Sequence, residues 1–159
     1  MLPKPVANME EYNRILEIHF RDDEECRENY RKYQAAYRQG YSMECSYLPV
    51  KMDYEVSRHC NFRCTMCLIS EGGDGGKANM SFEDFRESID GQRGLVEIKL
   101  QGLGEPLLNP DFFRMANYAV AKNIWVRTTT NASLLHINNN YKKLIDSKIG
   151  EIQISVDGA

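Results

Sequence analysis

The sequence predicts an α/β protein in which a helical N-terminal extension (residues 1–50) precedes a parallel sheet with helical crossovers (residues 51–159). Two observations predict this class. From residue 51 to the end, strand-like and helix-like segments alternate, and such alternation is typical of parallel β/α folds. The first fifty residues instead place apolar side chains three or four positions apart, as amphipathic helices do.

Two helices are expected in the N-terminal extension. The first begins at Asn8, because Asn8 and Glu11 form a capping-box-like start. The second covers about residues 23–39, and Gly40 is placed to end it. A stripe of tyrosines on the second helix could be a ligand platform, but a packing face with Cys26 as a small buried residue is favoured. The stripe consists of Tyr30, Tyr33 and Tyr37.

Four strands and three helices are expected after residue 50. Ser81 suits the N-cap of the first of these helices, and Asn109 with Pro110 suits the start of the second. The last strand of a parallel sheet is usually covered by a helix, so we expect a chain truncated after the fourth strand; a complete four-stranded domain is the alternative. The expected strands are 51–58, 95–100, 124–129 and 151–156, and the expected helices are 81–90, one from 109, and 139–147.

The composition argues against two classes of partner. The chain has 159 residues, 42% of them hydrophobic, and a net charge of -3, with lysines and arginines scattered rather than gathered into a stripe. No nucleic-acid partner is therefore expected. No apolar run approaches the ~20 residues of a membrane helix, and we expect neither a membrane partner nor a signal peptide. The expected location is cytoplasmic.

Three of the five cysteines fall within eight residues, as Cys60-x3-Cys64-x2-Cys67 directly after the first expected strand. A secreted disulfide scaffold would spread an even set along the chain, so clustered thiols favour a metal in a reducing compartment. Thiolates suit zinc or iron–sulfur clusters. Structural zinc needs four ligands, whereas three thiolates on a cubane leave one iron open. The alternative is that i, i+4, i+7 spacing buries three core thiols on one helix face.

Each later strand ends in a segment suited to ligand binding, and the carboxyl ends of parallel strands are where such folds gather ligands. Glycines let the backbone approach a ligand closely, and a carboxylate suits a cation. Singly, each segment is an ordinary turn. The segments are Gln101–Pro106 (QGLGEP), Thr128–Asn131 (TTTN) and Ser155–Gly158 (SVDG).

Together, the cysteine motif and these three strand-end segments resemble the radical S-adenosylmethionine (SAM) superfamily over residues 51–159. The resemblance implies the first four β/α units of a partial parallel (β/α)6 barrel. It also implies that the three cysteines ligate a [4Fe-4S] cluster whose fourth iron chelates the amino and carboxylate groups of SAM. The sequence departs from the family pattern at Met66, usually aromatic, and at Leu103 and Ala132, which replace glycines.

The resemblance also implies which residues contact SAM. Met66 takes the place of the residue beside the adenine, and Gly104 and Glu105 are expected to receive the ammonium group. Hydroxyl, amide and carboxylate groups at the next strand ends are expected to bind the ribose hydroxyls and the methionine carboxylate. These residues are Asn131, Ser155 and Asp157.

The implied activity is reductive cleavage of SAM to methionine and a 5′-deoxyadenosyl radical, which takes a hydrogen atom from a substrate. The implied partners are an electron donor such as flavodoxin or ferredoxin and a substrate that is a small molecule or a peptide. Residues 106–111 (PLLNPD) most resemble the branch of molybdopterin-precursor cyclases, peptide maturases and anaerobic sulfatase maturases. Two alternatives remain: a non-catalytic iron–sulfur or zinc module, and an inactive truncated fragment.

Overall fold

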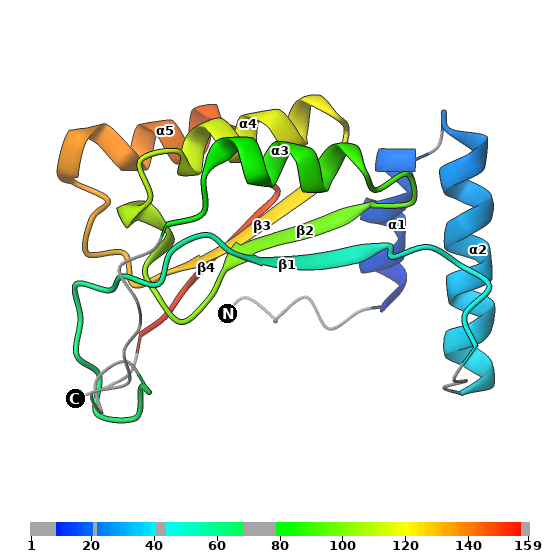
Figure 1. The fold of residues 1–159 in the computed structure, drawn as a ribbon, viewed down its shortest axis with the longest axis horizontal. Helices are drawn as coiled ribbons and strands as arrows, with labels where there is room; N and C mark the ends of the chain where they lie inside the picture. The colour runs from blue at the N-terminus through cyan, green and yellow to red at the C-terminus, as the bar shows by residue number, and fades with distance from the viewer. Residues whose placement is uncertain (1–8, 21, 41–43, 69–78, 157–159) are drawn as a thin grey trace.

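The computed structural model describes residues 9–20, 22–40, 44–68 and 79–156 (Figure 1). Its centre is one sheet of four strands in the order β1-β2-β3-β4, and every neighbouring pair is parallel. The predicted α/β class with sequential parallel strands is therefore confirmed. The strands are β1 (Lys51–Glu55), β2 (Glu97–Gln101), β3 (Trp125–Thr130) and β4 (Glu151–Ile154).

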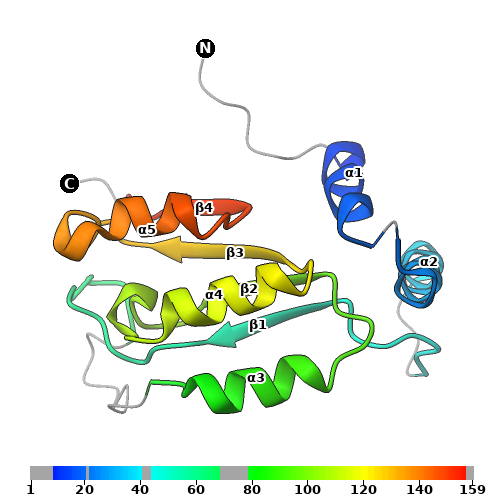
Figure 2. The same ribbon diagram turned by 90° about the horizontal axis from the view of Figure 1, so that it is seen from above.

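The helices that connect the strands, α3, α4 and α5, lie over one face of the sheet, whereas α1 and α2 lie at the amino ends of the strands (Figures 1 and 2). None of the described helices is long and apolar enough to cross a bilayer. The helices are α1 (Met9–Phe20), α2 (Glu24–Gln39), α3 (Phe82–Asp90), α4 (Phe112–Ala121) and α5 (Asn140–Asp146), with 3-10 turns η1 (Pro106–Leu108) and η2 (Ile137–Asn139).

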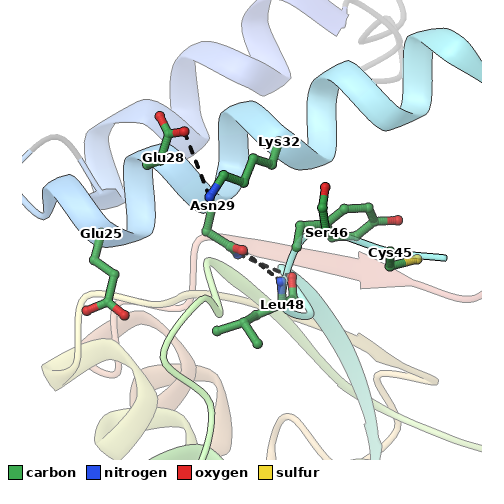
Figure 3. Close-up of a pocket in the computed structure, with 8 residues that line it drawn as sticks. Glu25, Glu28, Asn29, Lys32, Cys45, Ser46 and Leu48 are labelled. Atoms are coloured by element: carbon green, nitrogen blue, oxygen red, sulfur yellow. Dashed lines mark hydrogen bonds and ion pairs between the residues drawn. The ribbon is translucent and has the colours of Figure 1, made fainter.

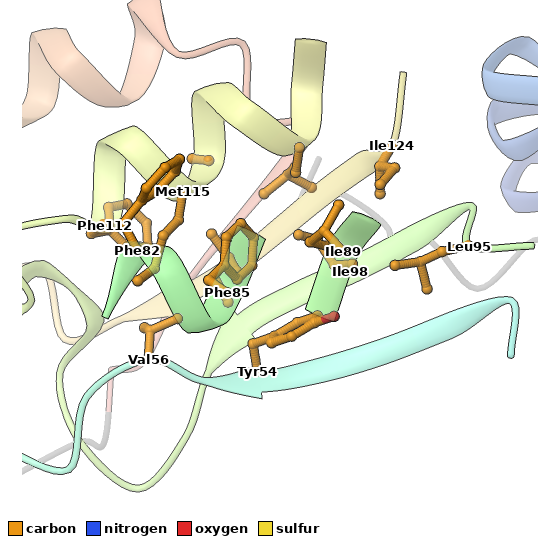
Figure 4. Packing of buried hydrophobic residues seen from close by; sticks show 14 of the residues in the cluster. Tyr54, Val56, Phe82, Phe85, Ile89, Leu95, Ile98, Phe112, Met115 and Ile124 are labelled. Atoms are coloured by element: carbon orange, nitrogen blue, oxygen red, sulfur yellow. The ribbon is translucent and has the colours of Figure 1, made fainter. Parts of the chain in front are cut away.

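The main apolar core lies between the sheet and helices α3 and α4 (Figure 4). Phe85 of α3 and Phe112 of α4 are fully buried against Ile98 of β2. The ring of Tyr54 meets Phe85 edge to face, with 5.0 Å between ring centroids. Each such large apolar side chain contributes about 1.5–3 kcal/mol through burial, so this layer is the main source of stability.

The predicted cap of α3 is confirmed, because the Ser81 hydroxyl accepts a hydrogen bond from the Asp84 backbone N–H at 3.1 Å. The predicted cap at Asn109 is wrong, since α4 begins only at Phe112. The buried Asn109 side chain instead donates to the carbonyl oxygens of Val56 (2.7 Å) and Met80 (3.0 Å). Buried carbonyl groups need donors, and this need outweighs the local capping signal.

Strand β1 ends at Glu55, three residues before the predicted end at Arg58. Beyond it, the Val56 carbonyl accepts from the Met80 backbone N–H at 3.0 Å, and Ser57 forms an isolated antiparallel bridge with Asn79. The chain therefore leaves the parallel sheet before the cysteine segment begins and returns to it just ahead of α3.

Helices α1 and α2 close the amino ends of the strands with a second apolar cluster. Leu16 and Tyr30 are buried in it beside Trp125, whose ring centroid lies 5.5 Å from that of Tyr12. Cys26 is buried here, as predicted, and burial raises the pKa of its thiol to about 11. The predicted packing role of the tyrosine stripe holds for Tyr30 and weakens along α2, because Tyr37 is 61% exposed. A domain boundary at residue 50 stays a prediction.

The face of the sheet turned away from α3–α5 is polar. Asp53, Lys99, Arg127 and Glu151 occupy consecutive register positions across all four strands. Arg127 donates hydrogen bonds to the carboxylates of Glu151 and of buried Glu97. Burial opposes the charge on Arg127, but these two carboxylates outweigh it and raise the pKa of the guanidinium. The sheet thus has an apolar face toward the helices and a charged face on the other side.

Candidate active site

A cavity of about 580 Å³ opens at the carboxyl ends of the strands. The segment after β1 and the ends of β2, β3 and β4 all contribute to it, as expected when parallel strands point one way. The structure brings together there every predicted site residue that it describes; Asp157 lies outside the described residues. These residues are Cys60, Cys64, Met66, Cys67, Gly104, Glu105, Asn131 and Ser155.

The three cysteines of the motif are free thiols, half-buried in the cavity wall. The Cys67 backbone N–H donates to the Cys64 carbonyl at 3.0 Å, which gives this part of the segment a turn rather than the helix that would align three thiols on one face. Within the described part of the chain, no three Cys, His, Asp or Glu side chains form a preformed group for a metal ion. Metal binding itself supplies the free energy that draws such ligands together.

Apolar side chains flank the thiols. Phe62, Met66 and Leu68 line the cavity and are 42%, 68% and 63% exposed. Large apolar groups exposed beside a cavity mark a surface on which a flat or apolar ligand group can be buried. Met66 is thus exposed to the cavity, and its contact with adenine stays a prediction.

Gly104 is required by close packing of two backbone segments. A Cβ atom at this position would lie 2.3 Å from the Ser57 carbonyl oxygen and 2.5 Å from that of His59. The next residue fastens the same contact, because the Glu105 backbone N–H donates to the His59 carbonyl at 2.6 Å. Gly104 therefore lets the end of β2 lie directly against the start of the cysteine segment.

The Glu105 carboxylate is buried and accepts three hydrogen bonds from within the protein. Its Oε1 accepts from the Thr130 hydroxyl at 2.6 Å and from the Leu107 backbone N–H at 3.3 Å. Its Oε2 accepts from the Asn131 backbone N–H at 2.8 Å. Glu105 thus ties the end of β2 to the end of β3, and the prediction that it also receives the ammonium group of SAM stays a prediction.

Asn131 lies between the end of β3 and the cysteine segment. Its amide nitrogen donates to the Asn61 side-chain oxygen at 3.1 Å and lies 3.9 Å from the Cys60 sulfur. Its side-chain oxygen accepts from both the backbone N–H and the hydroxyl of Ser133. In this structure the Asn131 side chain is therefore directed toward the thiol segment.

The ends of β2, β3 and β4 add polar groups to the cavity wall. The Thr129 hydroxyl donates to the Gln101 side-chain oxygen at 3.0 Å, and Gln153 of β4 lies within hydrogen-bond distance of the same hydroxyl at 3.4 Å. Ser155 is exposed, and its backbone N–H donates to the Thr130 carbonyl at 3.0 Å. This wall offers hydroxyl and amide groups to a polar ligand.

Seven further residues line the cavity that were not among the predicted contacts, although five of them lie in the predicted strand-end segments 101–106 and 128–131. The position of a residue at the end of an expected strand was a usable signal, because the carboxyl ends of parallel strands meet at one rim of the sheet. For Phe62 and Leu68 no signal existed beyond proximity to the cysteines. The additional residues are Phe62, Leu68, Gln101, Gly102, Leu103, Thr129 and Thr130.

A second cavity, of about 430 Å³, lies between α2 and the segment that leads to β1 (Figure 3). Exposed Cys45 lines it together with Glu25, Glu28 and Lys32. The side chain of Asn29 holds the segment by bonding to both the backbone N–H and the carbonyl of Leu48. Because α2 lies at the amino ends of the strands (Figure 1), this cavity is at the other end of the sheet from the cavity lined by the three clustered thiols.

Comparison with known proteins agrees with this geometry. The family model of the radical SAM superfamily matches residues 54–159. The mycofactocin maturase MftC of Mycobacterium ulcerans is 34% identical over 114 residues, which are 70% of this chain and 30% of that protein. The tungsten-containing aldehyde ferredoxin oxidoreductase cofactor-modifying protein of Pyrococcus furiosus is 26% identical over 65% of this chain and 29% of its own length. The chain thus spans less than a third of these relatives.

A solved structure supports the fold. BtrN, in complex with AdoMet and 2-DOIA, superposes with a TM-score of 0.57 at 21% identity, over 70% of this chain and 48% of BtrN. The family's cofactors are a [4Fe-4S] cluster and SAM, and its members are enzymes. Since the family model covers more than half of the chain, the identification does not depend on any single relative. The chain belongs to the radical SAM superfamily.

Proposed function

We propose that the protein binds a [4Fe-4S] cluster through Cys60, Cys64 and Cys67 and uses it to cleave SAM reductively. The observation that carries this proposal is the cavity that joins these thiols to the ends of β2, β3 and β4. The donor set fits the cluster, because three soft thiolates on one short segment leave one iron free for a further ligand.

The bound cofactors would supply a one-electron cleavage that yields methionine and a 5′-deoxyadenosyl radical for hydrogen abstraction from the substrate. The residues of this chain would bind, orient and shield. Phe62 and Met66 would cover the adenosyl group and exclude water, which radical chemistry requires. Asn131 and Ser155, with Asp157, would offer polar groups to the ribose and methionine ends of SAM, and Gly104 would bring the β2 backbone within reach.

The substrate we propose is polar, either a peptide or a small molecule. A charged row crosses the open face of the sheet, and Gln101 of the cavity wall donates a hydrogen bond to one of its members, Asp53, at 3.4 Å. The row consists of Asp53, Lys99, Arg127 and Glu151. A polar face of this kind would favour a ligand with hydrogen-bonding groups over a lipid-like one. The relatives named as a mycofactocin maturase and a cofactor-modifying protein are compatible with this class. A flavodoxin or ferredoxin in a reducing compartment, the cytoplasm, would supply the electron.

The test is anaerobic reconstitution of the full-length protein with iron and sulfide, followed by SAM and dithionite. We expect absorption of a [4Fe-4S] cluster and release of methionine and 5′-deoxyadenosine. Replacing any one of Cys60, Cys64 or Cys67 by Ala should abolish both, whereas Cys26→Ala and Cys45→Ala should preserve both. Those two cysteines lie at the amino ends of the strands and are the matched controls.

Two results would contradict the proposal. A cluster retained at full occupancy in Cys64→Ala would show that the ligands are other residues. Stoichiometric zinc binding without any SAM cleavage in the wild-type protein would identify a non-catalytic metal module instead.

A further inference from the structure

Asn61, Asn131 and Ser133 form a closed ring of three hydrogen bonds. The Asn61 amide donates to the Ser133 hydroxyl at 2.8 Å, and that hydroxyl donates to the Asn131 side-chain oxygen at 2.6 Å. The Asn131 amide in turn donates to the Asn61 side-chain oxygen at 3.1 Å, which closes the ring. Each group donates once and accepts at least once, so the direction of every bond in the ring is consistent.

The ring joins the cysteine segment to the segment that follows β3, which lies about seventy residues further along the chain. Its β3 side is fixed, because the Asn131 backbone N–H donates to the buried Glu105 carboxylate at 2.8 Å. The Ser133 backbone N–H also donates to the Asn131 side-chain oxygen, at 3.0 Å. On the other side, Asn61 directly follows Cys60, whose sulfur lies 3.9 Å from the Asn131 amide nitrogen.

We propose that this ring is a positioning device for the cluster: it holds the first cysteine against the end of β3 and directs the Asn131 amide N–H at the Cys60 sulfur. This proposal rests on the proposed function, since the sulfur is taken to be a cluster ligand. The role differs from a contact between Asn131 and SAM, because the amide acts on a ligand of the iron.

The hydrogen bond from the Asn131 amide to the Cys60 sulfur should affect the reduction potential of the proposed cluster. Reduction adds negative charge to the cluster and its sulfur ligands, and a donor aimed at one sulfur stabilises that charge, so it raises the reduction potential. The Phe62 backbone N–H, 3.4 Å from the same sulfur, acts in the same direction. Removing the Asn131 donor should therefore lower the potential, and a carboxylate in its place should lower it further.

The first experiment is a redox titration of the reconstituted full-length protein, monitored by electron paramagnetic resonance. We expect Asn131→Ala to shift the reduction equilibrium by up to tenfold, or about 59 mV downward for one electron. Asn131→Asp should shift it further, and Ser133→Ala should shift it less, because Ser133 acts on the sulfur only through Asn131. Asn79→Ala is the matched control, since among the described residues the exposed Asn79 side chain has no hydrogen-bond partner.

The second experiment uses the protein without iron, so the ring is tested even if no cluster forms. Amide hydrogen exchange of residues 60–67 should accelerate severalfold in Asn61→Ala, Asn131→Ala and Ser133→Ala and stay unchanged in Asn79→Ala. Unchanged exchange in all three ring variants would overturn the positioning role.

The two experiments test the role of the ring and the presence of the cluster independently. An unchanged potential in Asn131→Ala and Asn131→Asp, in protein with full cluster content, would overturn the role at the sulfur. Failure of the wild-type protein to assemble a cluster would contradict the proposed function, and hydrogen exchange alone would then decide whether the ring holds the cysteine segment.

Discussion

Helices α1 and α2 cover the amino ends of the strands with an apolar cluster, whereas the carboxyl ends surround the cavity that contains the clustered thiols. At the amino ends, Tyr12 of α1 donates to the carboxylate of buried Glu97, which also pairs with Lys51 (3.8 Å) and Arg127 (2.8 Å). The Lys51 ammonium lies 4.3 Å from the centre of the Tyr12 ring. At the carboxyl ends, three free thiols and the exposed side chains of Phe62 and Met66 line a cavity.

The two ends use buried carboxylates differently. Glu97 has cationic and phenolic partners, and its contacts close one end of the sheet with helix α1. The donors to Glu105 are neutral, and its contacts hold turns that surround the cavity. The contacts at the amino ends join helix α1 to the sheet, whereas those at the carboxyl ends hold backbone turns in place around the cavity.

Substitution at Gly104 should have the largest effect. In Gly104→Ala the new methyl group would meet two backbone carbonyls, and we expect a loss of about 3 kcal/mol in the free energy of unfolding. Urea denaturation measures this. The control is Gly91→Ala, where the nearest atom would lie 3.5 Å away and the change should stay within about 0.5 kcal/mol. Equal stability of the two variants would show that the turn after β2 is not tightly held.

Glu105→Gln should cost slightly less. The glutamine keeps the shape and one oxygen acceptor, but its amide would oppose the Asn131 backbone N–H, so we expect a loss of about 2 kcal/mol. Denaturation again provides the measurement. A matched change on the surface is Glu83→Gln, because Glu83 is exposed and forms an ion pair with a surface arginine 3.6 Å away. Equal stability of the two variants would show that Glu105 does not stabilise the contact between the ends of β2 and β3.

The amino end should respond to alkaline pH. Burial, with smaller effects from Asp23 and Glu25, raises the pKa of Cys26 from 9.0 to about 11. Below pH 9 this group contributes its full stability; between pH 9 and 11 the unfolded thiol ionises while the folded one does not. Stability should therefore fall by up to about 2 kcal/mol in that interval. Cys26→Ala should reduce the slope of unfolding free energy against pH, and an unaltered slope would refute the assignment.

Tyr12→Phe should have the smallest effect. It removes one donor from Glu97, which keeps Lys51 and Arg127, so we expect a loss of about 1 kcal/mol by denaturation. Iron content after reconstitution should not change, since the cavity lies at the other end of the strands. The control is Tyr141→Phe, at a residue that is 53% exposed, and it should be neutral. A loss of iron in Tyr12→Phe would show that the amino ends of the strands affect metal binding at the carboxyl ends.

Local signals predicted the helices and strand order well. Ser81 capped α3 as expected, and Gly40 ended α2, because both depend on residues a few positions away. Asn109 failed as a cap because a distant carbonyl, that of Val56, required its amide. The same long-range contact helps explain why β1 ends early.

The site was predictable in position but not in detail. Parallel strands bring their carboxyl ends to one rim, so Asn131 and the cysteines could be expected to meet. The Glu105 carboxylate accepts from Thr130, 25 positions away in the sequence. The Asn61 amide donates to Ser133, 72 positions away. Sequence spacing contains no information on such side-chain directions.

The pairing of Ser57 with Asn79 has a consequence for how the protein matures. Because the Met80 backbone N–H also donates to the Val56 carbonyl, backbone contacts hold the chain on both sides of the cysteine segment without using any cysteine side chain. We therefore expect folding of the sheet and assembly of the proposed cluster to be separate events. Doubling the length between these two points would cost only about 0.6 kcal/mol, so a longer segment there should be compatible with the same fold.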